Sequence, residues 1–334
     1  MTTPKNHHIL LSVQDLKVHF VGDDKVAHAL DGVSYGVSKG ETVCIVGESG
    51  CGKTVSALSI LGLIPQPPGQ IVGGQILFKE RDLLGLNEDE MQQIRGNHIA
   101  MVFQEPMTSL NPVFTIGDQI QEAITVHEKV SDAELLQRCV SLLTDVGIPS
   151  PEERLADYPH QLSGGQRQRV MIAMALACNP EIVIADEPTT ALDVTIQAQI
   201  LNLFKEIQRR RDMSLLYITH DLGVVANIAD RIYIMYAGII VEQGSAPEIF
   251  HDPRHPYTKG LLASLPSRAK RGTRLHSIPG TVPDPAFKPG GCPFHPRCSF
   301  AAETCRSQFP EMCDYGEGHL ARCPVVYNER AVTK

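Results

Sequence analysis

The chain has 334 residues, 43% of them hydrophobic, which is enough for one large domain with an appendage or for two modest domains. Its 30 basic and 38 acidic residues give a formal net charge of −8, which argues against a general nucleic-acid binder. No run reaches the ~18 apolar residues of a membrane-spanning helix, and Met1–Leu11 lacks a signal-peptide pattern, so we expect a cytoplasmic chain.

The first ~240 residues alternate short apolar runs with helical patterns, which predicts a sheet flanked by helices. Three near-continuous apolar runs are typical of buried strands in a parallel sheet: Thr42–Val46, Ile182–Ala185 and Leu215–Ile218. Gly74–Phe78 and its neighbours predict antiparallel strands with glycine turns. Ser131–Gly147 has apolar residues at helical spacing and is a candidate for a helical insertion.

The composition changes after Leu265. Ser267–Arg274 holds four basic residues, and Pro279–Pro296 holds six prolines, which cannot continue a helix or a central strand. We therefore expect a linker followed by a small, loop-rich tail. The basic residues Arg268, Lys270, Arg271 and Arg274 could lie near anionic lipid headgroups, but we prefer a solvated linker.

A phosphate-binding pattern follows the first of the three predicted buried strands. The pattern G-x-x-x-x-G-K-[ST] is matched by Gly47, Glu48, Ser49, Gly50, Cys51, Gly52, Lys53 and Thr54. Its glycines let backbone N–H groups surround phosphate oxygens at the start of a helix, where the helix dipole adds positive charge. Lys53 can reach the outer phosphates, and the Thr54 hydroxyl can bind Mg²⁺. Cys51 stands where serine is commoner, and its thiol is a candidate for oxidation.

Acidic and histidine side chains end the other two predicted buried strands. Asp186 and Glu187 follow Ile182–Ala185, and His220 follows Leu215–Ile218. In a P-loop enzyme an acid in the position of Asp186 holds Mg²⁺, and Glu187 could orient or deprotonate a water. Each signal alone is weak, because many strands end in such residues. Beside a P-loop they indicate a nucleotide-hydrolysing site.

A further motif gives the family. It is the string Leu162, Ser163, Gly164, Gly165 and Gln166, which lies between the P-loop and Asp186. With this order and spacing the chain resembles an ABC ATPase. The resemblance implies an α/β fold, an ABC-type P-loop ATPase domain with a mostly parallel core sheet, an antiparallel β subdomain and a helical signature subdomain.

The resemblance also implies a role for each motif residue. Phe20 would stack on the adenine of ATP, while Gln104 would contact Mg²⁺ and the attacking water. Glu187 would be the catalytic base, and His220 would touch the γ-phosphate. Ser163, Gly164, Gly165 and Gln166 would close over ATP held by a second subunit, and Asp193 would lie at the dimer seam. Thr54, Gln104 and Asp186 would bind Mg²⁺.

Other segments narrow the resemblance to ATPases of dipeptide and oligopeptide importers. They are Gln104–Pro112, Asp157–Gln161 and His255–Thr258. The resemblance implies an ATPase domain with its extension over 1–265 and a C-terminal domain over 266–334. It implies a sibling ATPase subunit, two membrane permeases and a periplasmic peptide-binding protein as partners. The chain would act as a peripheral protein on the cytoplasmic face of a bacterial inner membrane.

Five of the nine cysteines crowd the tail: Cys292, Cys298, Cys305, Cys313 and Cys323. In a reducing cytosol such a cluster indicates metal binding before disulfides. The spacing is not that of common zinc modules. The resemblance implies a 4Fe-4S cluster on Cys292, Cys298, Cys305 and Cys323, with Cys313 as a spare. A zinc site and unliganded thiols remain alternatives.

Other functions also remain open at this point. Related importers move nickel chelates or glutathione, and the sequence does not name the substrate. A soluble ABC ATPase acting on nucleic acid or ribosomes would carry long coiled coils or two ATPase domains, and neither pattern is present. A non-catalytic regulatory module is disfavoured by the intact Lys53, Asp186, Glu187 and His220.

Overall fold

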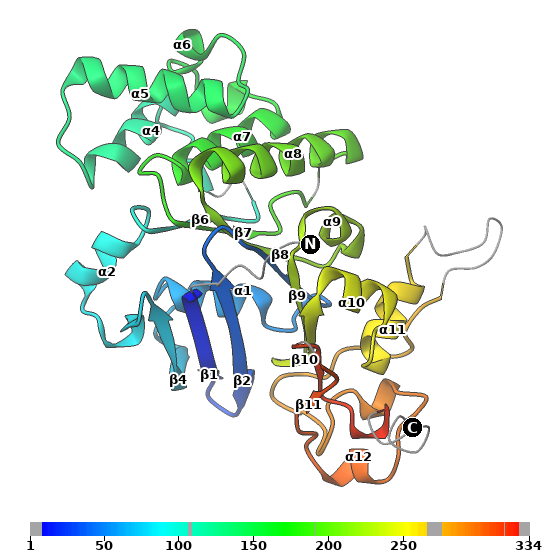
Figure 1. Cartoon of the computed structure of the whole chain (residues 1–334). Helices are drawn as coiled ribbons and strands as arrows, with labels where there is room; N and C mark the ends of the chain where they lie inside the picture. The colour runs from blue at the N-terminus through cyan, green and yellow to red at the C-terminus, as the bar shows by residue number, and fades with distance from the viewer. Residues whose placement is uncertain (1–8, 106–108, 191, 266–275, 317, 327–334) are drawn as a thin grey trace. The chain divides into compact units, whose positions relative to one another are not determined.

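The structure is a computed structural model that describes residues 9–105, 109–190, 192–265, 276–316 and 318–326 (Figure 1). The expected basic linker with Arg268, Lys270, Arg271 and Arg274 therefore lies outside the described residues. So do part of the Gln104–Pro112 segment and the residue at position 191. The chain divides into two compact units. The signature unit contains Ser38–Glu41 and the described part of Gly85–Tyr217, and the P-loop unit contains Ile9–Val37, Thr42–Leu84 and the described residues from Ile218 onward.

The P-loop unit has an antiparallel sheet of order β2-β1-β4-β5. Its strands are β1 (Ile9–Val21), β2 (Val26–Ser38), β4 (Gly69–Phe78) and β5 (Arg81–Asp82). The antiparallel pairing of β4 with β1 confirms the prediction for Gly74–Phe78. The register shifts near Gly74, whose φ is +95° and whose Cβ would lie 2.6 Å from the backbone of β1. Glycine is needed there because a side chain would collide with the neighbouring strand.

Further strands of the P-loop unit lie in the order β11-β12-β10-β9-β3. They are β3 (Thr42–Val46), β9 (Arg231–Tyr236), β10 (Ile239–Ser245), β11 (Cys313–Asp314) and β12 (Leu320–Ala321). All five residues of β3 are buried, and β3 pairs in parallel with β9, as its continuous apolar pattern predicts. Two short strands of the tail extend this sheet beyond β10, which the sequence did not indicate.

The helices of the P-loop unit are short. They are α1 (Lys53–Ile60), α9 (Leu222–Ile228), α10 (Ala246–His251), α11 (Pro256–Ala263) and α12 (Thr304–Ser307), with 3₁₀ turns at η1 (Leu83–Gly85) and η4 (His295–Arg297). Among its described residues, the tail has little regular structure besides η4, α12 and the two-residue strands β11 and β12, as its proline content predicts.

The signature unit contains the parallel pair β6 and β7, with β8 beside β7. Helices α4, α5 and α7 pack against one another (Figure 1). Ser131 caps α5, which confirms the helix predicted over Ser131–Gly147. The strands are β6 (Ile99–Val102), β7 (Ile182–Asp186) and β8 (Ser214–Thr219). The helices are α2 (Glu88–Ile94), α4 (Ile116–Thr125), α5 (Asp132–Asp145), α6 (Pro151–Arg154), η2 (Pro159–Gln161), α7 (Gly164–Ala175) and α8 (Val194–Arg211).

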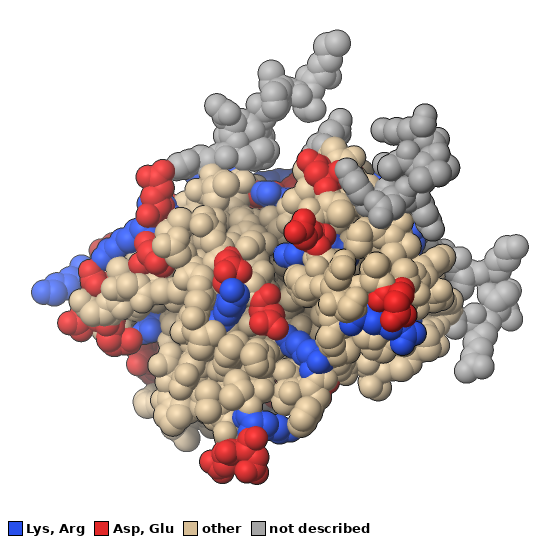
Figure 2. Space-filling model, turned by 90° about the horizontal axis from the view of Figure 1, so that it is seen from below, with Lys and Arg blue, Asp and Glu red and all other residues tan. Residues whose placement is uncertain are grey.

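The surface seen in Figure 2 carries acidic and basic side chains that are interspersed among uncharged residues. Among the described residues visible in that view, the basic side chains form no continuous stripe of the kind that binds a phosphate backbone. Among the described residues, no helix combines the length and the apolar character needed to cross a membrane.

Within the P-loop unit, a buried carboxylate on β10 connects the tail to the rest of the unit. Glu242 on β10 has no exposed surface and accepts hydrogen bonds from the backbone N–H groups of Arg254 (2.7 Å) and His255 (2.9 Å). His319, directly before β12, places Nε2 2.7 Å from the same carboxylate. One side chain therefore satisfies polar groups of two distant segments.

We predict that Glu242→Ala lowers the free energy of unfolding by about 3–5 kcal/mol, because it leaves buried donors without an acceptor. Urea unfolding followed by circular dichroism measures this loss. Glu88→Ala is the matched control, because the Glu88 side chain is 65% exposed and its pair with Arg95 is worth at most about 1 kcal/mol. Equal losses in the two variants would contradict the anchoring role of Glu242.

Candidate functional site

Gly47–Gly52 connects β3 to α1 in the P-loop unit, and Lys53 and Thr54 begin α1, which is the strand–loop–helix order that the motif requires. Gly52, the N-cap of α1, has φ of +104°, a conformation that favours glycine. A Cβ at Gly47 would lie 2.2 Å from the carbonyl oxygen of Met235 on β9. Glycine at both positions is therefore required by the path of the loop and by its packing.

Lys53 folds over its own loop. Its Nζ donates to the carbonyl oxygens of Gly47 (2.8 Å) and Glu48 (3.1 Å), and the residue is only 5% exposed. Thr54 is exposed, whereas Cys51 is buried. Burial raises the pKa of the Cys51 thiol to about 11, so the thiolate that oxidants attack is scarce at neutral pH. The oxidation suggested by the sequence is thus disfavoured.

Phe20 and His220 also belong to the P-loop unit. Phe20 lies near the end of β1, and its ring edge approaches Gly69 so closely that a Cβ there would be 3.2 Å from it. His220 is exposed and comes directly after β8. Asp221 caps the following helix α9 by accepting from the N–H of Gly223 at 2.7 Å, which fixes the turn that carries His220.

In the signature unit, the structure brings Gln104 and Glu187 together. Glu187 Oε2 accepts hydrogen bonds from Gln104 Nε2 (3.3 Å) and from Thr190 Oγ1 (3.0 Å). Glu187 follows the buried strand β7 and has φ of +45°, which is uncommon for a residue with a side chain. Asp186, the last residue of β7, is 2% exposed. A chain turn thus places two carboxylates and an amide at one end of β7.

The signature residues form the first turn of α7. Ser163 Oγ accepts from the N–H of Gln166 (3.3 Å), and Gln166 Oε1 accepts from the N–H of Ser163 (2.9 Å), a reciprocal capping box. A Cβ at Gly165 would lie 3.0 Å from Ile196 of α8. Asp193 caps α8 by accepting from the N–H of Ile196 at 2.9 Å. Exposed Ser163 and Gly164 therefore present the amino end of α7 beside the start of α8.

The five tail cysteines line one cavity of about 450 Å³ in the P-loop unit. All nine cysteines of the chain are free. Among the described residues, which include all of these thiols, no three sulfurs lie within 4.8 Å of one another. The predicted ligands are thus gathered around a common space, but no three of their sulfurs lie within 4.8 Å of one another.

The thiols in this cavity affect one another electrostatically. Burial, followed by the neighbouring Cys298, Cys292 and Cys305, raises the pKa of Cys323 to about 11. Burial and the neighbours Cys305 and Cys298 raise the pKa of Cys292 to about 11. For Cys313 the pKa is raised by burial and by Glu311, and none of the other four thiols is a cause.

Sequence reasoning missed two groups of residues in the P-loop unit. Arg297 of the tail contacts Glu48 of the P-loop, and His19, His28 and Asp31 lie close together. The one local signal for Arg297 is its position directly before Cys298 of the tail cluster. No local pattern links His19 to His28, because they meet only when β1 and β2 lie side by side.

Two family models match the chain. An ABC transporter model matches residues 30–190, and a model for the C-terminal region of oligopeptide and dipeptide transporters matches residues 241–305. A probable peptide ABC transporter ATP-binding protein of Sinorhizobium fredii is 53% identical over 94% of both chains. Dipeptide transport ATP-binding proteins are 53% identical in Bacillus subtilis and 51% identical in Escherichia coli, each over 94% of this chain and 94% and 96% of their own lengths.

Solved structures agree with these matches. An ATP-binding cassette solved as a dimer in a post-hydrolysis state with ADP and Pi has a TM-score of 0.64 at 28% identity, covering 71% of this chain and 98% of its own. A cassette from Clostridium perfringens, part of a cbiONQ transporter complex, has a TM-score of 0.63 at 27% identity, covering 73% and 91%.

Proposed function

The chain belongs to the ATP-binding subunits of peptide ABC transporters, and we propose a working cycle in which its ATP hydrolysis drives the uptake of dipeptides or longer peptides. The observation that carries the proposed chemistry is the contact between Gln104 and Glu187 at the end of β7. It joins a water-orienting amide to a carboxylate within one unit. The remaining assignments follow motif by motif.

The P-loop is assigned to the phosphates of ATP. Backbone N–H groups of Gly47, Ser49, Gly50, Cys51, Gly52, Lys53 and Thr54 would bind phosphate oxygens at the start of α1. Lys53 already lies over the loop, so a small movement from the carbonyls of Gly47 and Glu48 would bring its ammonium to the outer phosphates.

Mg²⁺ is assigned to the Thr54 hydroxyl, the Asp186 carboxylate and the Gln104 amide. These are oxygen donors of the kind that Mg²⁺ prefers, and the near-complete burial of Asp186 favours a cation as its neighbour. When bound, Mg²⁺ neutralises charge on the phosphates.

Glu187 is assigned as the general base. Its carboxylate accepts hydrogen bonds from Gln104 and Thr190, which hold it in one orientation. A water that donates to this carboxylate would transfer a proton to it while the water oxygen bonds to the γ-phosphorus, and the bond from that phosphorus to the β-phosphate oxygen would break to release ADP. Gln104 would orient that water. His220 would contact the γ-phosphate, and Phe20 would stack on adenine.

We propose that the signature binds ATP held by a second subunit, so two subunits are needed in this cycle. Ser163, Gly164, Gly165 and Gln166 present the amino end of α7, which suits the phosphates of ATP held by a partner subunit. Asp193 would lie at the dimer seam. Closure of the dimer then depends on ATP, because ATP favours the closed state.

We assign a sibling ATPase chain, two membrane permeases and, through them, a periplasmic peptide-binding protein as partners, with no role for nucleic acid. The subunit would lie on the cytoplasmic face of the inner membrane. Residues 1–265 would form the ATPase domain with its extension, and 266–334 the C-terminal domain. This assembly is supported by the similar ATP-binding cassette that was solved as a dimer and by the Bacillus subtilis relative named as a dipeptide transport ATP-binding protein.

We assign the cysteine cavity to a 4Fe-4S cluster held by Cys292, Cys298, Cys305 and Cys323. These thiols line one cavity of about 450 Å³, and thiolates gathered around a common space are the ligands that an iron–sulfur cluster takes. A bound cluster would serve as a structural staple for a tail with few apolar residues. Cys313 lines the same cavity and is left out as the spare fifth thiol.

We predict that Glu187→Gln binds ATP but lowers kcat at least about 100-fold, because the base is lost while the phosphate contacts remain. Phosphate release and ATP binding are measured on the same preparation. Glu206→Gln, an exposed change on α8, should leave both unchanged. Normal turnover in Glu187→Gln would remove Glu187 from the mechanism.

We predict that Lys53→Ala weakens ATP binding itself about 10- to 100-fold, because it removes charge-assisted contacts to phosphate. Equilibrium binding of a fluorescent ATP analogue measures the change. Lys259→Ala alters an exposed lysine of the same unit and serves as the control. Unaltered affinity in Lys53→Ala would contradict the proposed phosphate site.

We predict about four iron and four acid-labile sulfide per chain in protein purified without oxygen. Cys298→Ser should lose most of both, and Cys313→Ser should keep them, because only Cys298 is a proposed ligand. Metal analysis by mass spectrometry and a colorimetric sulfide assay give the result. Zinc, or no metal, would leave the ATPase assignment standing and reopen the choice of ligands.

A further inference from the structure

Within the P-loop unit, the side chain of Arg297 connects the cysteine tail to the P-loop. Arg297 Nη1 donates to both carboxylate oxygens of Glu48, at 3.0 and 3.2 Å, and Nη2 donates to one of them at 3.2 Å. The Arg297 side chain is 6% exposed and that of Glu48 is 31% exposed. A shielded, forked contact of this kind is among the stronger hydrogen-bonded ion pairs in proteins.

Two further contacts hold the Arg297 side chain in place. Its Nε donates to the carbonyl oxygen of Pro279 at 2.8 Å, and its guanidinium lies 5.7 Å from the ring centre of Tyr236. It ends the 3₁₀ turn η4, which lies between Cys292 and Cys298. Any change in how these two cysteines are held would therefore act directly on the turn that presents Arg297.

A second contact reaches the same P-loop residue. The backbone N–H of Glu48 donates to the Tyr257 hydroxyl at 3.0 Å. The Tyr257 ring packs against Tyr236 and Phe294, with ring centres 4.7 and 5.4 Å away. The carbonyl of Glu48 accepts from Lys53. All three polar groups of Glu48 are thus engaged, two of them by groups that lie far along the chain.

We propose that Arg297 is a positioning residue for the P-loop, through which the cysteine tail sets the affinity for ATP. This inference rests on the proposed phosphate role of the P-loop. An unpaired carboxylate on Glu48 would repel the phosphates of ATP and would release one side of the loop. Arg297 neutralises that carboxylate and holds it toward the tail.

The test measures ATP binding and thermal unfolding for the full chain and its variants. Arg297→Ala should weaken ATP binding about tenfold or more. The double variant Arg297→Ala with Glu48→Gln should recover most of that loss, because the repelling charge is gone. Arg306→Ala, an exposed arginine of the same tail that pairs with Glu303, should bind like the unaltered chain.

Wild-type affinity in Arg297→Ala would overturn the proposal. So would a loss that Glu48→Gln does not reduce, because the arginine would then act only as a structural support. Lys53→Ala distinguishes a failure of the proposed phosphate site from a failure of the proposed role of Arg297. If Lys53→Ala loses affinity and Arg297→Ala does not, the phosphate site stands and only the role of Arg297 fails.

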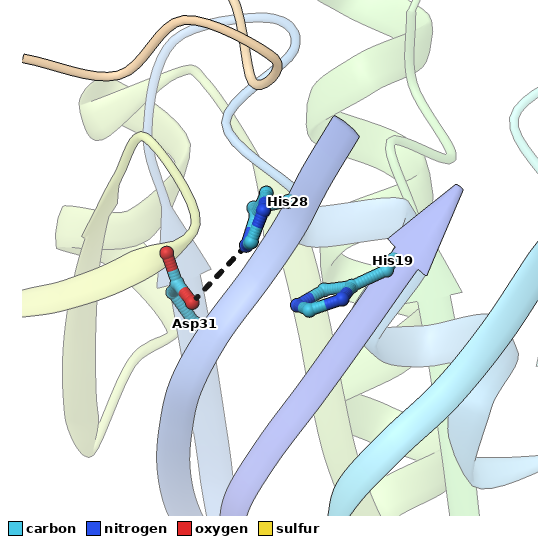
Figure 3. A group of neighbouring side chains, drawn as sticks. All are labelled: His19, His28 and Asp31. Atoms are coloured by element: carbon cyan, nitrogen blue, oxygen red, sulfur yellow. Dashed lines mark ion pairs between the residues drawn. The ribbon is translucent and has the colours of Figure 1, made fainter. Parts of the chain in front are cut away.

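An independent feature of the P-loop unit is a group of two imidazoles and a carboxylate. Figure 3 shows His19 on β1 beside His28 on β2, with Asp31 close to His28. The two rings have centres 4.1 Å apart, and His28 Nδ1 lies 3.9 Å from Asp31 Oδ1. One ligand atom from each residue lies within 4.8 Å of the others.

The surrounding backbone and side chains hold this group in place. The N–H of His28 donates to the carbonyl of Pro285 (3.0 Å), and that of Asp31 donates to the carbonyl of Gly238 (2.9 Å). Lys288 Nζ lies 3.2 Å from Asp31 Oδ2, the oxygen that does not approach His28. A lysine on the outer oxygen orients a carboxylate whose other oxygen serves as a metal ligand.

We also propose that His19, His28 and Asp31 form a site for a divalent transition-metal ion of the Zn²⁺ class. Two imidazoles and one carboxylate are a donor set that such ions prefer, and water can supply the remaining position. The ligands come from neighbouring strands, so little reorganisation is needed. This site is separate from the cysteine cavity.

The test counts Zn²⁺ bound at equilibrium to the full chain whose tail cysteines hold the proposed 4Fe-4S cluster. The unaltered chain should bind one Zn²⁺ more per chain than His28→Ala or His19→Ala. His276→Ala, which removes a single exposed histidine, should match the unaltered chain. Equal zinc content in the unaltered chain and in both site variants would overturn the proposal.

Discussion

The conformation of the P-loop is the constraint on which the rest of the P-loop unit depends. The Met235 carbonyl leaves no space for a side chain at Gly47, and Lys53 binds the loop carbonyls from within. Tyr257 and Arg297 hold the loop at Glu48. Loops that bind phosphate with backbone amides must be fixed before the ligand arrives, because ordering them afterwards would cost binding energy.

The signature unit also has a segment whose conformation is fixed by its own contacts before a ligand binds. Ser163 and Gln166 satisfy each other's backbone N–H groups, and Asp193 does the same for the start of α8. Gly165 lets the two helix starts approach, because a Cβ there would press on Ile196. A signature of small and amide residues thus yields an exposed helix end whose geometry is set by caps and not by ligand.

The tail has a small apolar core and several strong local side-chain contacts. Phe294 packs among Tyr236, Tyr257 and His255, and Glu242 satisfies buried donors from two segments. A segment with so few regular elements gains little from helix or strand hydrogen bonds, so side-chain contacts and the proposed cluster must hold it. The same side-chain contacts hold the tail next to the P-loop. The proposed effect of the tail on the P-loop therefore needs no intermediate segment.

The sequence by itself determined the family, the P-loop, the signature and the buried strands, because these depend on local spacing and on continuous apolar runs such as Thr42–Val46. It also identified the cysteine cluster, and its capping signal at Ser131 placed the start of α5. Only the tertiary structure decided which side chains meet. Gln104 contacts Glu187, Arg297 contacts Glu48, and His19 lies beside His28 through packing of segments that are remote in the chain or paired across strands. No local pattern encodes such pairings, because they arise from the order of strands and from the shape of the packed core.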